Sequence, residues 1–548
     1  MELLADWCRR TGLSIIQLLP MNDVGFNFRP YDSESSIALE PMHLCLEKVR
    51  GVSVSPFMDE IRALRKKFPL DSCWFDTAVK KEKLKVLKKM FLRRKPQEDI
   101  DFTRYRSEQR FWLESYALFK CIKAKMGQTA WEAWPGPLRD REDTAIRKVK
   151  DEQKDELEFQ EWLQWQLYSQ FCDAAASIRK KGVYLMGDLP FLAARDSADV
   201  WSQPRYFKLH LSAGAPPDLY FAGGQEWGMP PYDWAALESG GYDYLVEKLK
   251  YAENFYDLFR IDHFVGLFRV WTLASRGSEA ERKKSGAFDP AEESLWEAQG
   301  ERILSVILSN SRMLPCAEDL GTVPECSFRV LEKYALPGME IQRWMRDWGR
   351  TFGFKSGDEY RLNSIVTLST HDMTPFAVWW DQEAGTVKRR IFESKCREYG
   401  VPFETLARRL FDKKQSDAEH LRWKKDVVVT QELDILRELH SATFDEKEKF
   451  WKAVGLGGAP ESRCSEKLVL AALEAAGQAR SVFSIQLLQD WLALSDKVRD
   501  ACSDARINEP GLVHEKNWRF RVPIYLEDMN KMGLNRTLRT LNQKTKRA

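Results

Sequence analysis

The sequence predicts an α/β protein, a TIM-type (β/α)8 barrel with helical insertions whose first barrel strand is missing from this chain. Two observations support this fold class. Short apolar runs typical of buried parallel strands alternate with helical segments along the chain. Three of these runs also end in acidic segments, which are LFRIDHF (258–264), CAEDLG (316–321) and LSTHDM (368–373). Side chains at the ends of parallel barrel strands converge on one face, so the acidic segments are expected to share a site.

The chain opens with a predicted helix, Met1–Gly12, which the glycine terminates. A buried strand is predicted over Leu13–Leu19 and ends before Pro20. The irregular polar loop MNDVGFNFRPYDSESS follows it. No strand is predicted ahead of the opening helix. The pattern thus supplies seven strands, whereas a closed barrel of this type needs eight. We therefore expect the start of the chain to be truncated or misassigned.

Residues 56–180 are predicted to be a helical insertion. Apolar residues recur at helical spacing in four segments, which are Phe57–Lys67, Thr77–Arg94, Ser107–Met126 and Asp155–Lys180. The basic run VKKEKLKVLKKMFLRRK belongs to the second of them, and it could form an anion-binding patch. Its apolar residues fall at helical intervals, so a solvated outer helix face is the favoured interpretation.

The remaining strands follow in order, separated by helices or loops: Val183–Leu189, Tyr256–Asp262, Arg312–Glu318, Gly338–Gln342, Ile365–Ser369 and Ser481–Leu487. Residues 381–480 form a second charged, helical stretch, which is predicted to be an insertion before the last strand. The whole chain, residues 1–548, is expected to be a single catalytic barrel domain.

Composition narrows the classes of function. With 84 basic and 82 acidic residues, the net charge of +2 gives no electrostatic reason to expect a nucleic-acid or membrane partner. The 10 cysteines include no CxxC pair, and the 7 histidines show no HxxH pattern, so no metal site is expected. The N-terminal residues do not resemble a secretory signal. A reducing, cytoplasmic location is predicted, and the oligomeric state stays open.

The acidic segments have the chemistry of a retaining glycosidase. Arg260 and Asp262 are two residues apart in a strand and face the same side, and the guanidinium favours the carboxylate form needed by a nucleophile. Glu318 closes an apolar strand, where desolvation should raise its pKa toward that of a general acid. Asp372, next to His371, could hold the hydroxyl groups of the same sugar. The retaining mechanism predicts a carboxyl separation of about 5–5.5 Å between Asp262 and Glu318.

Each segment also has a structural explanation. RxDH could be an ion pair, ED an acidic pair at a helix N-terminus, and HD a loop cap, but their joint arrangement at three strand ends favours catalysis. Two further segments support the same site. GDLPFLAARDSADVW places Asp188 at a strand end, with Asp196, Ser197 and Asp199 as caps or sugar ligands. The loop Gly214–Trp234 carries five exposed-looking aromatic residues that could stack on sugars.

Taken together, these segments resemble the 4-α-glucanotransferases, the amylomaltase or disproportionating-enzyme family (glycoside hydrolase family 77). The likeness runs in the same order along the whole chain. It is carried by QLLPMND, FWLESYALFKCIKAK, WEAWP, GDLPFLAARDSADVW, PPDLYFAGGQEWGMPPYDW, FRIDHF, AEDLGTVPE, LPGMEIQRW, STHD, LLQDWLAL and NWRFRVP. The chain departs from the family at Met229 and Met373, where asparagine is common.

The resemblance implies that Asp262 is the nucleophile, Glu318 the general acid and base, and Asp372 the stabiliser of the transition state. Together with the strand-end residues, the expected substrate-binding set is Arg260, His263, His371, Asp319, Gln225, Trp227, Tyr232, Asp188, Asp196 and Ser197.

The reaction that the resemblance implies moves a segment of an α-1,4-glucan or maltooligosaccharide to the 4-hydroxyl of another, with retention and without a cofactor. Two alternatives stay open. An α-glucan hydrolase would use the same carboxylates, because the two activities differ only in whether sugar or water attacks the intermediate. A catalytically inactive glycan-binding protein is the other, although the intact set of three carboxylates argues against it.

Overall fold

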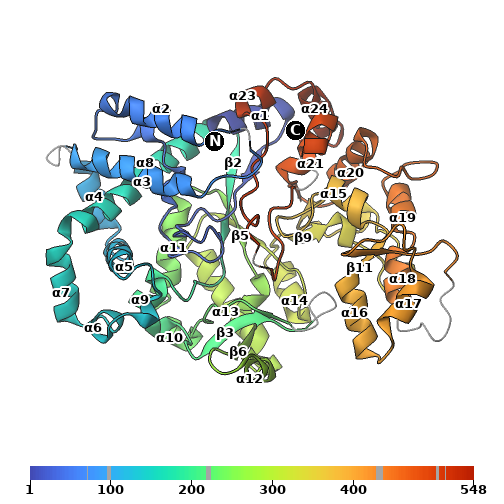
Figure 1. Ribbon diagram of the computed structural model, residues 1–548, viewed down its shortest axis with the longest axis horizontal. Coiled ribbons are helices and arrows are strands. Elements are labelled where there is room, and N and C mark those ends of the chain that lie inside the picture. Colours follow the sequence, from blue (N-terminus) through green and yellow to red (C-terminus); the bar gives the residue numbers. More distant parts are fainter. Residues whose placement is uncertain (71, 95–99, 218–223, 428–435, 502–504, 513) are drawn as a thin grey trace. The chain divides into compact units, whose positions relative to one another are not determined.

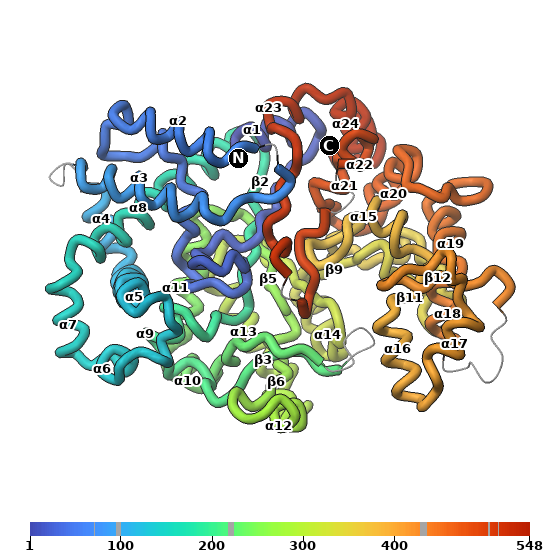
Figure 2. Tube along the Cα trace, viewed as in Figure 1, coloured from blue at the N-terminus to red at the C-terminus, as the bar shows by residue number. Residues whose placement is uncertain are grey.

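The computed structural model describes residues 1–70, 72–94, 100–217, 224–427, 436–501, 505–512 and 514–548. These residues form two compact units, which we describe separately (Figure 1). Unit 1 comprises Met1–Asp6, Ser14–Ala215 and Glu226–Val330, and unit 2 comprises Trp7–Leu13, Pro216–Gln225 and Leu331–Ala548. The path of the chain within each unit can be followed in Figure 2.

A parallel four-stranded sheet forms the centre of unit 1. Its order is β1 (Ile15–Gln17), β2 (Tyr184–Leu189), β5 (Leu258–Ile261) and β8 (Leu314–Ala317). All four strands lie within predicted strand segments. Every residue of β5 is buried, as expected for a parallel strand covered on both faces. In β2, a Cβ at Gly187 would lie 2.6 Å from the ring of Tyr256, so only glycine allows this close approach.

The sequence analysis did not predict the strands β3 (Leu211–Ala215), β6 (Val270–Ala274) and β7 (Ala287–Asp289) of unit 1, which form an antiparallel sheet in this order. The short strand β4 (Gln225–Glu226) has one residue in each unit. These strands have two to five residues each, too few for a period-2 pattern to stand out from a loop. Residues 226–234, within the aromatic loop of the sequence analysis, run alongside the β3 end of this sheet, where Trp227 donates its backbone N–H to Ala213.

The helices of unit 1 confirm the predicted helical stretch. Within residues 56–180, all four predicted segments contain helix, and the longest helix, α8, has 27 residues with Trp162 and Trp165 buried. The helices are α2 (Met58–Lys67), α3 (Ala78–Leu92), α4 (Ile100–Glu108), α5 (Leu113–Lys125), α6 (Gly136–Arg139), α7 (Asp143–Glu152), α8 (Lys154–Lys180), α9 (Ala198–Ser202), α10 (Trp234–Ser239), α11 (Asp243–Glu253), α12 (Glu279–Lys284) and α13 (Trp296–Ser309).

Two helices contribute residues to both units. They are α1 (Glu2–Thr11) and α14 (Glu325–Lys333). The predicted end of α1 is confirmed, because Gly12 follows it with a φ of +79°, a left-handed conformation that favours glycine.

Unit 2 contains the other three predicted strands. They form a parallel sheet in the order β13 (Phe483–Ser484), β10 (Ser364–Thr367) and β9 (Gly338–Ile341). A short antiparallel pair, β11 (Thr386–Lys388) and β12 (His420–Arg422), accompanies it. The helices are α15 (Phe376–Val378), α16 (Arg389–Glu398), α17 (Phe403–Leu410), α18 (Arg437–Thr443), α19 (Glu446–Ala453), α20 (Glu466–Gln478), α21 (Leu488–Leu492), α22 (Asp496–Ala501), α23 (Leu526–Met529) and α24 (Leu534–Lys544).

The predicted second insertion has a core of its own within unit 2. Phe392, Phe411 and Trp423 pack together there, with the Phe411 and Trp423 ring centroids 4.5 Å apart. Across the described ranges of the chain, none of the helices is both long enough and apolar enough to span a membrane.

Candidate active site

Arg260 is the centre of the polar site in unit 1. It lies in β5, where it pairs with Asp188 of β2, and its side chain is 8% exposed. One guanidinium nitrogen, Nη1, donates to both carboxylate oxygens of Asp188, at 2.9 and 3.0 Å, and to Oδ1 of Asp262 at 2.8 Å. The other, Nη2, is 3.7 Å from Oε2 of Glu318. A single buried cation therefore contacts three carboxylates that the sequence placed at three strand ends.

Glu318 and Asp262 extend the strands β8 and β5 by one residue each. The backbone N–H of Glu318 donates to Ile261, and that of Asp262 donates to Leu189. Both side chains thus project from the carboxyl edge of the sheet, the edge at which α/β proteins bind ligands. The sequence prediction that these segments meet at one edge is confirmed for Asp188, Asp262 and Glu318.

The carboxyl groups of Glu318 and Asp262 have different surroundings. Burial raises the pKa of Glu318 from 4.5 to about 8, with Arg260 opposing the shift and the charge of Asp262 adding to it. The side chain of Asp262 is 24% exposed and accepts a hydrogen bond from Arg260. Glu318 is thus suited to donate a proton at neutral pH, whereas Asp262 lies beside the guanidinium with part of its surface open to solvent.

His263 fixes Glu318 through its backbone. Its N–H donates to Oε2 of Glu318 at 2.8 Å, and its φ of +48° is left-handed. A non-glycine residue in this conformation costs about 1 kcal/mol, and such strain is concentrated at functional sites. The His263 imidazole meets Trp227 edge to face, with ring centroids 4.8 Å apart. Burial lowers the pKa of His263 to about 4, so the ring is neutral at physiological pH.

Tyr31 is a site residue that the sequence analysis did not single out. Its hydroxyl donates to Oδ2 of Asp188 at 2.7 Å and accepts from Nη1 of Arg260 at 3.5 Å. It belongs to the polar loop that follows β1. The sequence did contain one indication of this role for Tyr31. Its loop, like the acidic segments, begins at the carboxyl end of a predicted parallel strand.

Other predicted binding residues have structural partners in unit 1. Asp196 forms an ion pair with Lys123 at 2.6 Å and accepts the backbone N–H of Trp131. Ser197 is fully buried and caps the N-terminus of α9 by accepting the N–H of Val200. Asp319, next to Glu318, is 5% exposed.

The aromatic loop is less exposed than the sequence suggested. Tyr232 and Trp234 are 2% and 8% exposed, so the expectation of exposed rings is wrong for both, because they pack against each other with centroids 5.1 Å apart. Trp227 is half-buried against His263, and Gln225 begins β4. Tyr220 and Phe221 lie outside the described residues.

The third acidic segment lies in unit 2, after β10. Asp372 has a side chain that is 43% exposed, and its Oδ2 is 3.3 Å from Nε2 of His371. The side-chain amide of Asn508 donates to Oδ1 of Asp372 at 2.7 Å, and its backbone N–H donates to the carbonyl of His371. The indole of Trp518 lies against His371, with centroids 5.7 Å apart. The sequence analysis missed Asn508, whose segment INEPGL gives no local signal.

Comparison with known proteins gives a consistent result. Residues 1–527 match the family model described as 4-alpha-glucanotransferase. The 4-alpha-glucanotransferase of Chlamydia pneumoniae is 32% identical over 531 residues, which covers 96% of this chain and 87% of the relative.

Two solved structures show the same fold. The amylomaltase from Streptococcus agalactiae in complex with acarbose superimposes with a TM-score of 0.74 at 21% identity, covering 100% of this chain and 94% of that one. The amylomaltase from Corynebacterium glutamicum gives a TM-score of 0.70 at 19% identity, covering 98% and 71%. This likeness confirms the predicted fold class, a TIM-type barrel with helical insertions.

Proposed function

The chain belongs to the 4-alpha-glucanotransferase family, and on that premise we propose that it moves α-1,4-glucan segments between maltooligosaccharides or glucans by a retaining double displacement. The observation that carries this proposal is the contact of one buried guanidinium, that of Arg260, with both Asp262 and Glu318. The two carboxyl groups differ in exposure and hydrogen bonding, as an acid and a nucleophile require.

Asp262 is the proposed nucleophile. Its carboxylate attacks the anomeric carbon, the glycosidic bond to the leaving sugar breaks, and a covalent glycosyl-enzyme forms. Arg260 contacts only one of its oxygens, Oδ1. The interaction therefore holds the carboxylate in place while the other oxygen, Oδ2, is available for attack.

Glu318 is the proposed general acid and base. With a pKa raised to about 8 by burial, it carries a proton at pH 7 and can deliver it to the leaving oxygen. The acceptor hydroxyl of the incoming sugar then returns a proton to Glu318 as it attacks the intermediate. The backbone N–H of His263 holds Oε2 throughout, which leaves Oε1 for the transfer.

Asp372 is proposed to stabilise the transition state through the sugar hydroxyls, with His371 beside it. Support comes from its environment in unit 2, where Asn508 orients one carboxylate oxygen. The remaining substrate-binding roles are proposed for Trp227 and His263, whose packed rings offer an apolar surface for a sugar face.

We also propose that residues 1–548 work as one catalytic barrel domain, with 56–180 and 381–480 as helical insertions. The continuous family match over residues 1–527 supports this. A reducing, cytoplasmic location is part of the same proposal, since the nine cysteines that the structure describes carry free thiols.

The deciding experiment incubates the purified chain with maltotriose, resolves the products by length and assays free glucose. A ladder of longer maltooligosaccharides formed together with glucose is the expected result. Glucose and maltose without longer products would instead indicate a hydrolase. Asp262→Asn should abolish the ladder while leaving the melting temperature within a few degrees, because the change is nearly isosteric; substantial residual transfer would contradict the nucleophile assignment.

A further inference from the structure

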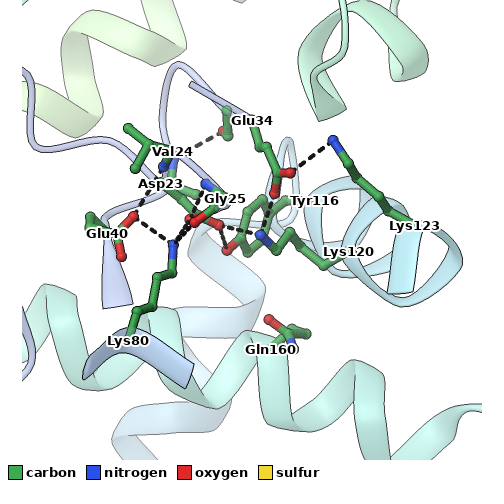
Figure 3. A network of polar contacts seen from close by, with 12 residues as sticks. Asp23, Val24, Gly25, Glu34, Glu40, Lys80, Tyr116, Lys120, Lys123 and Gln160 are labelled. Atoms are coloured by element: carbon green, nitrogen blue, oxygen red, sulfur yellow. Dashed lines mark hydrogen bonds and ion pairs between the residues drawn. The ribbon is translucent and has the colours of Figure 1, made fainter. Parts of the chain in front are cut away.

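Acidic side chains of the loop that follows β1 meet lysines from two helices in a cluster of charges (Figure 3). Three ammonium groups meet four carboxylates there, and the side chains come from the loop, from two helices and from the segment before α9. We call this set the buried cluster, with Asp196, whose side chain is 34% exposed, at its edge: Asp23, Glu34, Glu40, Lys80, Lys120, Lys123 and Asp196.

Lys80 connects helix α3 to both ends of the loop. Its side chain is 2% exposed, and Nζ lies 2.9 Å from Oδ1 of Asp23 and 2.8 Å from Oε2 of Glu40. It also donates to the carbonyl of Gly25. The expectation that the basic run of α3 is a solvated face is wrong at this residue, because Lys80 points inward and contacts two buried acidic side chains.

Lys120 makes the matching connection from helix α5. Its Nζ lies 2.7 Å from Oδ2 of Asp23 and also contacts Glu34. The hydroxyl of Tyr116, one turn earlier on α5, donates to the same Oδ2 at 2.7 Å. Both oxygens of Asp23 are therefore held by side chains from the helices, one set from α3 and one from α5.

The two carboxyl groups that Lys80 contacts have pKa values shifted in opposite directions. Burial by itself would raise the pKa of Asp23, but Lys120 and Lys80 hold it well below its ordinary value. Burial raises the pKa of Glu40 to about 7 even though Lys80 is adjacent.

The cluster fixes the loop backbone on both sides of Tyr31. Asp23 precedes this residue, and its carbonyl accepts the N–H of Glu34, which follows it. Glu40 accepts the N–H of Val24 at 3.1 Å. These contacts join the two ends of the loop, residues 22–24 and 34–40, to each other. Tyr31 lies in the part of the loop between these two ends.

Stability alone does not explain such a cluster. Removing charges from water is costly, and buried ion pairs are often no more stabilising than apolar residues of similar size. What a fully hydrogen-bonded buried network does provide is a single, well-defined arrangement of the segments that it joins.

We propose that the buried cluster positions Tyr31 against Asp188, and that Lys80 and Lys120 are therefore positioning residues for the reaction. The connection is continuous in the structure: the cluster holds the loop, Tyr31 donates to Asp188 at 2.7 Å, and Asp188 accepts from the same Arg260 nitrogen that contacts Asp262. This proposal rests on the proposed function, because it concerns the geometry of that site.

The test is a double-mutant cycle between the cluster and Tyr31. Lys80→Met combined with Glu40→Gln removes the ammonium group together with the ionisable group of its partner Glu40, while Asp23 keeps Lys120 as a partner. The pair should lower kcat for maltotriose disproportionation about tenfold, the cost of a small misplacement at the reacting groups. In a Tyr31→Phe background the same pair should cause no further loss, because the contact that it disturbs is already absent.

A milder variant and a matched control accompany this cycle. Tyr116→Phe removes only the hydroxyl that donates to Asp23, and it should give a smaller loss that also disappears in the Tyr31→Phe background. Lys88→Met with Glu156→Gln removes a half-buried ion pair between α3 and α8, about 12 Å further along the same helix as Lys80. This control should lower the melting temperature slightly and leave kcat unchanged.

A cluster that only stabilises the fold predicts a different result from the double-mutant cycle. If the cluster only stabilises unit 1, its loss should reduce kcat by the same factor with or without the Tyr31 hydroxyl, or not at all. Either outcome would overturn the proposal.

Hydrogen exchange measured by mass spectrometry separates this proposal from the proposed function. Amides of residues 22–40 should exchange at least tenfold faster in the Lys80→Met, Glu40→Gln protein than in the wild type, and unchanged exchange would refute positioning by the cluster. If the wild type forms no transfer products, the proposed function fails, whereas the exchange result still decides whether the cluster holds the loop.

Discussion

Replacing Glu318 with glutamine should make the protein more stable and catalytically inactive. The glutamine keeps the size of the side chain and an oxygen that can accept the His263 N–H. It cannot ionise and cannot donate a proton to a leaving sugar. Both effects come from the same burial, which raises the pKa of Glu318 from 4.5 to about 8.

The sign of the stability effect follows from proton binding. Between pH 4.5 and about 8, the folded protein keeps the Glu318 proton, whereas the unfolded chain has lost it. The folded state then binds one more proton than the unfolded state, so rising pH lowers the free energy of unfolding of the wild type. The variant lacks this titration, and its advantage should therefore grow with pH over this window.

The magnitude follows from the size of the shift. Each pKa unit corresponds to about 1.4 kcal/mol, so a shift from 4.5 to about 8 sets a ceiling of about 5 kcal/mol on the advantage of the variant. Removing the acid should lower kcat by about 10²–10⁴-fold, the usual contribution of general acid catalysis.

Urea unfolding of both proteins at pH 5, 6, 7 and 8 measures the effect, and the matched control is Glu332→Gln. Glu332 is exposed on α14, so this variant reports the general effect of a glutamate-to-glutamine change on stability at each pH. A Glu318→Gln protein whose stability difference from the wild type stays constant or shrinks from pH 5 to pH 8 would refute the assignment of a proton to Glu318.

Three further predictions concern the supporting structure. Asp188→Asn weakens the hydrogen bonds that orient the central guanidinium, and initial rates of the folded protein with maltotriose should fall about 10²-fold; unchanged rates would contradict this role. Gly187→Ala places a methyl group 2.6 Å from the Tyr256 ring, and chemical denaturation should show a loss of about 1–3 kcal/mol, whereas a neutral result would mean that the ring moves freely. Arg346→Met leaves Glu446, which is 7% exposed, without its cation, and should cost about 3–5 kcal/mol of stability while kcat in the remaining folded protein stays normal.

Local sequence patterns predicted the parallel strands because these strands are buried on both faces. Such runs are mostly apolar, and in Leu258–Ile261 every residue is buried, with Arg260 as the one charged residue. The long helices were predicted for a similar reason, since α8 repeats its buried apolar residues at helical spacing over 27 residues. The short antiparallel strands were missed, because two to five residues carry too little pattern.

The sequence by itself determined which acidic residues end the strands, and with them the meeting of Asp188, Asp262 and Glu318 around Arg260. Parallel strands in register bring their carboxyl ends to one edge of the sheet. The order of residues along the chain was therefore sufficient to predict that these side chains meet. Only the tertiary structure decided that Tyr31 joins this site and that Lys80 is buried. Both depend on contacts between segments far apart in the chain, where burial and charge pairing in three dimensions outweigh the local preference of a basic helix or a polar loop for water.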